Sequence, residues 1–291
     1  MGVIGLGLMG TAITERLLER GAAVWVWNRT PDKAGPLLAR GAGWSDNPLA
    51  QCRRVILSLY DSQAVAETLE RLASGLAPGR LVVDTTTGDP LRSEAMARAL
   101  AERGVIYLEA PISGSSEQTR RGEATVLVGG ATEGFEACSD LWPALGRQVF
   151  HVGPSGSAAR MKLVTNLVLG LNRAALAEGL ALAEHLGLDA AGTLRVLAGT
   201  VAYSRTMDTK GRKMVDRDYS VQARLSQHLK DVRLMLDLAG AGGLPLPLST
   251  AHARVLEQAE EAGWGERDNS ALIEVLRRPP APSVPPTPTA P

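Results

Sequence analysis

Lys162 and Asn166 are the two residues whose types and spacing most directly suggest chemistry. They lie in a stretch where apolar residues recur at three- and four-residue steps, a pattern typical of a helix. Residues four apart project from one face of a helix, so the ammonium and the amide would lie side by side. Together they could bind a carbonyl oxygen and a neighbouring carboxylate. Most helical lysines are simply solvated, so this interpretation needs support from the rest of the chain.

The glycine-rich start of the chain is a candidate for dinucleotide binding. A short apolar run leads into Gly5, Gly7 and Gly10, and a helical pattern follows from about residue 11 to residue 19. In the dinucleotide fingerprint these glycines allow a tight turn, approach to the pyrophosphate and close helix packing. The pyrophosphate would lie over unpaired N–H groups at the start of the helix. The whole predicted binding turn is Gly5, Leu6, Gly7, Leu8, Met9 and Gly10.

Asn28, Arg29 and Thr30 end the second predicted strand, at residues 23–27, and bear on the choice of cofactor. NAD-binding units usually place an acid here for the ribose 2′-hydroxyl, and a carboxylate would repel the 2′-phosphate of NADP. Asn28 is neutral, and Arg29 can bind a phosphate through two nitrogens. These residues predict NADP as the cofactor, with NAD as the alternative, although an arginine at a strand end could also simply face solvent.

The first half of the chain alternates between strand and helix. Strands are predicted at residues 54–59, 81–84, 105–109 and 125–128, and helices at 62–72 and 89–103. This order predicts a mostly parallel sheet covered by helices on both faces, with ligands beyond the carboxyl ends of the strands. The loops after those strands, at residues 59–62, 84–90 and 110–116, carry hydroxyls that could bind a ligand, although such residues are also common in any loop.

The second half reads as helix throughout. Helical patterns cover residues 172–186, 190–197, 220–238, 248–261 and 269–276. We therefore predict an α/β Rossmann domain at residues 1–154, an all-helical domain at 155–278 and a long helix joining them. Residues 279–291 are mostly Pro, Ala, Ser and Thr, a composition that predicts a disordered tail.

Composition narrows the functional classes. The 291 residues include 31 basic and 31 acidic side chains, so the formal net charge of zero does not suggest nucleic acid or an anionic membrane as a partner. Two distant cysteines and four scattered histidines show no redox or metal-ligand spacing, so no metal is expected. Neither a leader nor a membrane span is evident, and a cytoplasmic protein is the expectation.

The motifs, taken in order, resemble those of the β-hydroxyacid dehydrogenases, the family that contains 3-hydroxyisobutyrate dehydrogenase and the glyoxylate and succinic semialdehyde reductases. The resemblance runs from Gly2 to about Arg278. It rests on the glycine turn and four later segments, at residues 84–90, 110–114, 153–166 and 230–231.

The resemblance implies a role for each matching residue. Lys162 would be the catalytic lysine, Asn166 would orient the substrate, and Ser113 and Gly114 would hold its carboxylate. The positions that match cofactor contacts are Leu59, Tyr60, Thr87 and, from the helical domain, Lys230.

Two departures from the commonest family pattern are relevant. Ser115 replaces a second glycine after Gly114, a variant associated with the glyoxylate and succinic semialdehyde reductase branch, and we include it among the substrate-binding residues. Thr165 stands where many members carry a first asparagine. Arg120 and Arg121 could enlarge a carboxylate pocket or simply be solvated.

These observations predict an NADP-preferring oxidoreductase that interconverts a small semialdehyde or oxo acid and its hydroxyacid. The alternatives are a non-catalytic cofactor-binding or assembly module and an imine reductase of the same architecture, which would be expected to lack Lys162. The apolar surface of residues 163–186 exceeds what one small helical domain needs, so a homodimer or homotetramer is also predicted. The sequence does not specify the hydroxyacid or the physiological direction.

Overall fold

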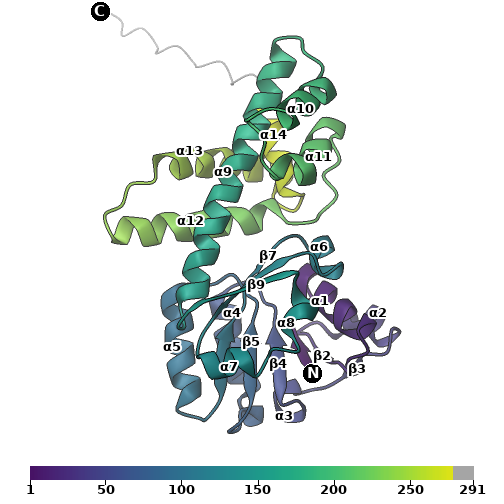
Figure 1. The fold of residues 1–291 in the computed structure, drawn as a ribbon, viewed down its shortest axis with the longest axis vertical. Coiled ribbons are helices and arrows are strands. Elements are labelled where there is room, and N and C mark those ends of the chain that lie inside the picture. Colours follow the sequence, from purple (N-terminus) through teal and green to yellow (C-terminus); the bar gives the residue numbers. More distant parts are fainter. Residues whose placement is uncertain (278–291) are drawn as a thin grey trace, which may run out of the picture. The chain divides into compact units, whose positions relative to one another are not determined.

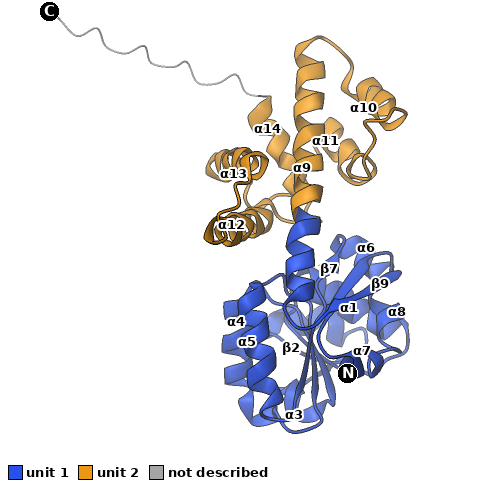
Figure 2. Ribbon diagram, turned by 60° about the vertical axis from the view of Figure 1, so that its left-hand side comes forward, with its two compact units in different colours: residues 1–166 blue, residues 167–291 orange. Residues whose placement is uncertain are grey.

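The structure is a computed structural model that describes residues 1–277, which form two compact units, one up to Asn166 and the other from Leu167 (Figures 1 and 2). The predicted tail at residues 279–291 lies outside the described residues. No helix within residues 1–277 is both long and apolar enough to cross a membrane. In the same range no three His, Cys, Asp or Glu side chains are grouped to hold a metal ion.

The first unit is built on a nine-stranded sheet in the order β3-β2-β1-β4-β5-β6-β8-β7, with β9 pairing with β8. The first six strands are parallel and have the 3-2-1-4-5-6 order of a Rossmann fold, as predicted. The strands are β1 Gly2–Ile4, β2 Trp25–Trp27, β3 Gly43–Trp44, β4 Arg54–Leu57, β5 Leu81–Asp84, β6 Ile106–Glu109, β7 Ile112–Ser113, β8 Thr125–Gly129 and β9 Gln148–Gly153.

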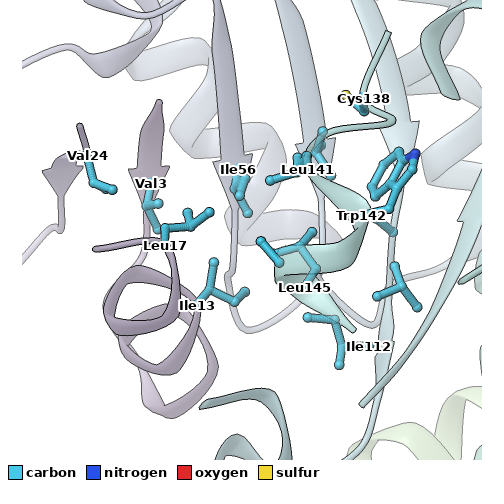
Figure 3. Packing of buried hydrophobic residues seen from close by; sticks show 14 of the residues in the cluster. Val3, Ile13, Leu17, Val24, Ile56, Ile112, Cys138, Leu141, Trp142 and Leu145 are labelled. Atoms are coloured by element: carbon cyan, nitrogen blue, oxygen red, sulfur yellow. The ribbon is translucent and has the colours of Figure 1, made fainter. Parts of the chain in front are cut away.

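Helices cover both faces of the sheet because alternate strand residues are apolar on each side. Val3 and Ile56 contribute to a cluster with the helices α1 and α8, which Figure 3 shows. Their neighbours Ile4 and Val55 contribute to a second cluster with α4 and α5. The helices of this unit are α1 Leu8–Glu19, α2 Gly35–Leu38, α3 Pro48–Gln51, α4 Ser62–Arg71, α5 Pro90–Ala101, α6 Ser116–Arg120, α7 Thr132–Glu136 and α8 Trp142–Leu145.

Several predicted boundaries differ from those observed. Helix α1 begins at Leu8, inside the glycine turn rather than after it, because Gly7 already serves as its N-cap. The predicted strands at residues 23–27, 54–59 and 105–109 are each shorter, because the sheet pairing covers only residues 25–27, 54–57 and 106–109. The prediction missed β3 and β7, which are two residues each, and β9, whose residues alternate without strong hydrophobicity.

Helix α9, Ser157–His185, is the long helix predicted to follow the sheet, and it includes both the predicted helical stretch around Lys162 and most of its predicted continuation at residues 172–186. The two compact units divide within α9, after Asn166. The domain boundary near residue 154 stays a prediction. The apolar residues Met161, Val164 and Val168 of α9 are exposed, at 43%, 58% and 53%, whereas Lys162 and Asn166 are buried. The apolar stripe therefore does not form the core of either unit, and the predicted oligomer remains a prediction.

The second unit is helical throughout, as predicted. Its buried core brings together α9 residues such as Leu176 and Leu180 with Leu225, Leu229 and Leu256 from the other helices. Those helices are α10 Ala190–Ala198, α11 Arg212–Asp216, α12 Leu225–Ala241, α13 Pro247–Ala259 and α14 Ile273–Leu276, with a π-helical turn at Met207–Gly211 and a 3₁₀ turn at Asn269–Leu272. The α12 pattern was predicted to begin at residue 220, but residues 220–224 are not helical.

Asp268 is the main polar support inside the second unit. It is fully buried, and both of its oxygens lie 2.8 Å from the Nζ of Lys210. It also accepts hydrogen bonds from the backbone N–H groups of Gln222 and Ala223. Burial alone would raise the pKa of Asp268, but Lys210 and these hydrogen bonds lower it below its usual value. The carboxylate thus joins three segments of the unit as a charged group.

We predict that Asp268→Asn destabilises the protein by about 3–5 kcal/mol, because it leaves the buried Lys210 ammonium without its counter-charge. Chemical unfolding followed by circular dichroism would measure the change. Asp237→Asn, which changes an exposed aspartate on α12, is the matched control and should be near neutral. A loss for Asp268→Asn no larger than that of the control would show that the buried pair is dispensable.

Candidate active site

The glycine turn connects β1 to α1 and leaves room for an anion. A side-chain carbon at Gly10 would lie 1.8 Å from the carbonyl oxygen of Gly5, and one at Gly5 would lie 2.3 Å from that of Ser58. These two glycines therefore permit close backbone packing. Gly7 differs, because nothing lies within 4 Å of the place its side chain would occupy. No side chain caps the start of α1, so its first N–H groups are available to a phosphate.

Asn28 and Arg29 follow β2 next to this turn. The Asn28 side chain accepts a hydrogen bond from the backbone N–H of Leu6 at 2.9 Å and donates one to the carbonyl of Thr30 at 2.8 Å. Asn28 therefore fixes the glycine turn to the end of β2, a structural role that the sequence did not suggest. Arg29 and Thr30 are exposed, and Arg29 makes no ion pair within residues 1–277.

The loops after β4 and β5 are held together at the same edge of the sheet. The Thr86 hydroxyl accepts a hydrogen bond from the backbone N–H of Leu59 at 3.1 Å, and the Thr85 hydroxyl donates to the carbonyl of Leu57 at 2.7 Å. Leu59 and Thr87 are partly buried, and Tyr60 is 54% exposed. The loops that carry the predicted cofactor contacts are thus joined by hydrogen bonds from two threonine side chains to the backbone.

Asp84, the last residue of β5, holds the loop that follows it through hydrogen bonds. Its carboxylate accepts hydrogen bonds from the Thr86 backbone N–H at 2.9 Å and from the Tyr107 hydroxyl at 2.7 Å. Burial raises the pKa of Asp84, although these hydrogen bonds oppose the rise. Burial and the nearby Asp84 charge raise the pKa of Tyr107 well above its ordinary value. Sequence reasoning missed this pair, and the only available signal was an acid that ends an apolar strand.

The predicted carboxylate-binding segment lies at the end of β7 and the start of α6. Ser113 pairs with Thr125 in the sheet and is partly buried, and Gly114 is exposed. Ser115 caps α6, because its hydroxyl accepts from the Gln118 backbone N–H and its own N–H donates to the Gln118 side chain. This cap accounts for Ser115 without a ligand, while its predicted contact with substrate stays a prediction.

Arg120 and Arg121 both make ion pairs. Arg120 pairs with Glu15 at 2.6 Å and with Glu117 at 2.8 Å, and Arg121 pairs with Glu123 at 3.1 Å. The pair between Arg120 and Glu15 links α6 to α1. The sequence left open a carboxylate pocket or solvation for these arginines, and ion pairing within the protein is a third role that it did not suggest.

Lys162 and Asn166 lie on the buried face of α9, with exposed fractions of 5% and 8%. The helix starts next to the sheet, where the buried Glu109 at the end of β6 accepts a hydrogen bond from the backbone N–H of Gly156 at 2.5 Å. Lys162 follows Gly156 by six residues, within the first two turns. A lysine is rarely this buried unless its charge is paired, so the solvated interpretation of Lys162 is not supported.

Lys230 lies on α12 in the second unit and makes an ion pair with Asp231 at 3.1 Å. All the other predicted site residues belong to the first unit.

A hollow of about 960 Å³ in the first unit lies where the strands begin rather than where they end. It is lined in part by Arg54, Leu81 and Ile106, the first residues of β4, β5 and β6. None of the predicted site residues lines it. Ligands of parallel sheets bind at the opposite edge, which carries the glycine turn and the two tied loops.

Comparisons with known proteins match this arrangement. The family described as the NAD-binding domain of 6-phosphogluconate dehydrogenase matches residues 1–153. The family described as the NAD-binding domain of NADP-dependent 3-hydroxyisobutyrate dehydrogenase matches residues 156–276. The chain is 30% identical, over 283 residues, to glyoxylate/succinic semialdehyde reductase 2 of Arabidopsis thaliana, a match that covers 95% of this chain and 79% of the relative.

The chain belongs to the β-hydroxyacid dehydrogenase family. Its fold agrees with that of a 3-hydroxyisobutyrate dehydrogenase from Salmonella typhimurium, with a TM-score of 0.87 and 27% identity over 94% of this chain and 98% of the other. The chain is also 31% identical over 278 residues to the cytokine-like nuclear factor N-PAC of Xenopus tropicalis, covering 94% of this chain and about half of N-PAC. As a β-hydroxyacid dehydrogenase, the protein is an NAD(P)-dependent oxidoreductase.

The surroundings of Gly7 and Gly10 predict opposite effects for the same substitution. Gly7→Ala should fold with a stability within about 1 kcal/mol of the natural chain, since its side chain meets no other atom. It should weaken cofactor binding at least tenfold, or about 1.4 kcal/mol, because the methyl group occupies the phosphate approach. Gly10→Ala should lower the stability of the protein even when no cofactor is present, because its methyl group would clash with the carbonyl oxygen of Gly5.

Thermal unfolding and a fluorescence titration with the reduced cofactor would measure both effects. If Gly7→Ala bound the cofactor as tightly as the natural chain, the pyrophosphate could not lie at this turn.

Proposed function

We propose that the protein is an NADP-preferring dehydrogenase or reductase that interconverts a small semialdehyde or oxo acid and the corresponding hydroxyacid. The observation that carries the proposal is the buried position of Lys162 on α9, one helical turn before Asn166. The similarity to a glyoxylate/succinic semialdehyde reductase supports the same class of substrate.

Lys162 would supply the acid and base of the reaction. A bound nicotinamide cofactor supplies or accepts the hydride. When a carbonyl carbon is reduced, negative charge grows on its oxygen, and the Lys162 ammonium would stabilise that charge and donate the proton. In the oxidative direction, the neutral amine would remove the proton from the hydroxyl. Asn166 would hold the same oxygen or the adjacent carboxylate, because its amide can both donate and accept hydrogen bonds.

Ser113 and Gly114 would bind the substrate carboxylate through a hydroxyl and a backbone N–H. A short carboxylate fits these donors without a charged partner, because backbone N–H groups can hold an anion by themselves. The hydroxyl and the backbone N–H of Ser115 both take part in the cap of α6, so its contact with the substrate is the least supported part of this proposal. Thr87, Tyr60 and Lys230 remain proposed cofactor contacts.

The preference for NADP rests on the end of β2. No carboxylate occupies positions 28–30, and Asn28 holds the glycine turn. Arg29 is exposed and follows the second strand, where the 2′-phosphate of NADP would be bound. The name of the family that matches the second half of the chain, an NADP-dependent dehydrogenase, supports the same preference.

A non-catalytic binding module is the second candidate, and its support is the similarity to a relative that is named as a nuclear factor and not as an enzyme. Such a protein has no need for an ammonium in a buried position, and this chain has one at Lys162 together with Asn166 and Ser113. An imine reductase would be expected to lack the lysine altogether. An activity screen with short semialdehydes and hydroxyacids separates the candidates, because all three would bind the cofactor.

We predict that Lys162→Ala lowers kcat by about 10²- to 10⁴-fold, the usual contribution of positioned proton transfer. Cofactor affinity should change little, since the lysine acts on the substrate. Lys33→Ala, which removes an exposed lysine of the same unit, is the control and should retain activity. Steady-state kinetics with each accepted substrate would test this, and near-natural rates for Lys162→Ala would contradict the assigned role.

We predict that Arg29→Asp shifts cofactor preference towards NADH. The change replaces a phosphate-binding cation by a carboxylate that repels the phosphate, and a charged hydrogen bond is worth about 1.5–3 kcal/mol. The ratio of kcat/KM for NADPH to that for NADH should therefore fall at least about tenfold. Arg195→Asp, on the exposed face of α10, should leave the ratio as it is. An unchanged ratio in Arg29→Asp would remove the argument from the 2′-phosphate.

A further inference from the structure

Glu109 is a buried acid that the proposed reaction does not use directly. It ends β6, is 2% exposed, and its Oε2 accepts the hydrogen bond from the Gly156 backbone N–H at 2.5 Å. Its other oxygen, Oε1, is also buried. A buried carboxylate loses its hydration, so its presence here requires a reason.

The backbone around Glu109 is shaped to bring the start of α9 against the carboxylate. A side-chain carbon at Gly129 would lie 2.7 Å from the Glu109 Oε2 and 2.9 Å from the backbone nitrogen of Ala158. Gly156 has a φ of +90°, which favours glycine, and it is the residue that donates to Glu109. Glycine at both positions therefore lets the carboxylate reach the first turn of α9.

A negative charge at the start of α9 also has a direct electrostatic effect. The first N–H groups of a helix carry a partial positive charge, and a carboxylate there holds the helix end more firmly than a neutral acceptor would. Lys162 lies within the first two turns of that helix. Any movement of the helix start would displace its amine.

We propose that Glu109 is a positioning residue of the proposed reaction. Its carboxylate anchors the first turn of α9 to the carboxyl end of β6 and so fixes the place of Lys162. The inference rests on the proposed function for its effect on catalysis, but the anchoring itself can be measured without any substrate.

The charge on Glu109 lowers the stability of the fold at neutral pH. Burial raises its pKa to about 6, against hydrogen bonds from Gly156, Ser93 and Ala158, and the nearby Asp84 charge adds to the rise. Folding therefore favours the protonated form. The stability that protonation contributes is present below the ordinary carboxyl pKa of about 4.5 and is lost as the pH rises through 6. A charge that costs stability and contacts the catalytic helix is better explained by function than by folding.

Few other charges surround Glu109. Asp84 on β5 and the Tyr107 hydroxyl on β6 are the titratable neighbours from the sheet, and the pKa values of both are raised. On the side of α5 and α9, Glu94 and Arg160 form an ion pair of 2.6 Å next to Gly156. Asp84 is hydrogen-bonded to Tyr107 within the sheet, whereas Glu109 is hydrogen-bonded to Gly156. Glu109 is therefore the carboxylate of this group that holds the start of α9.

The test compares Glu109→Gln with the natural protein and with Glu94→Gln, which breaks the exposed tie between α5 and α9. The glutamine keeps an acceptor for Gly156 and removes only the charge. At pH 8, hydrogen–deuterium exchange of residues 155–163 should be at least about tenfold faster in Glu109→Gln, while its unfolding temperature should be equal to or higher than that of the natural protein. Lys162→Ala should leave exchange of this segment unchanged.

Turnover supplies the second measurement. In the natural protein kcat should rise through an apparent pKa near 6. In Glu109→Gln it should be about 10- to 100-fold lower at pH 8 and flat between pH 5 and 7, since small misplacements of a catalytic group have effects of this size. KM should change little, and Glu94→Gln should keep the rise near pH 6.

Two results would overturn the inference: unchanged exchange of residues 155–163 in Glu109→Gln, or a natural kcat that is flat between pH 5 and 7.5. A lower unfolding temperature with natural kcat would show a purely structural role. If Glu109→Gln failed to fold, Glu109→Asp, which keeps the charge but falls one methylene short of Gly156, should give the same faster exchange. If exchange were faster in Glu109→Gln but the natural protein turned over none of the proposed substrates, the anchor would be correct and the proposed function would be wrong.

Discussion

The backbone N–H groups at the start of two helices determine how the carboxyl edge of the sheet is used. Those of α1 have no side-chain cap, and the space above Gly7 is open, so an external anion can bind there. At α9, the backbone N–H of Gly156, the residue before the helix, already donates to the carboxylate of Glu109. The partial positive charge at a helix start therefore has two uses here. At α1 it is available to bind the cofactor phosphates, and at α9 it attracts Glu109, which we propose fixes the place of Lys162.

The sequence predicted the parts of this edge that depend on local backbone constraints. Gly5 and Gly10 allow a packing that any side chain would prevent, so their spacing signalled the turn, and the apolar strands signalled a parallel sheet in Rossmann order. The exact start of α1 was missed. The glycine spacing predicts a turn before a helix, but it does not show that Met9 and Gly10 already belong to the helix. Local patterns fix the type of an element better than its ends.

Contacts between segments distant in the chain could not be predicted. Asn28 was predicted to be one of the cofactor-binding residues, and nothing in its local sequence showed that its side chain would lie 2.9 Å from the N–H of Leu6, twenty-two residues earlier. The bond between Tyr107 and Asp84 and the bond between Gly156 and Glu109 depend on which strands are neighbours and on where α9 begins. In the second unit, Asp268 meets Lys210 across fifty-eight residues. None of these pairs has a periodic signal, because each is formed by the fold as a whole.

The orientation of α9 is the most informative departure from simple pattern reading. A helix of a soluble protein normally turns its apolar stripe inward, yet Met161, Val164 and Val168 are exposed and the polar residues Lys162 and Asn166 are buried. Burying an ammonium and an amide gains nothing from the hydrophobic effect and costs their hydration. The exposed apolar residues in the first half of this helix are therefore not explained by the stability of the single chain. This arrangement is explained if the buried face is kept for chemistry and the apolar face is kept for a surface that another molecule covers.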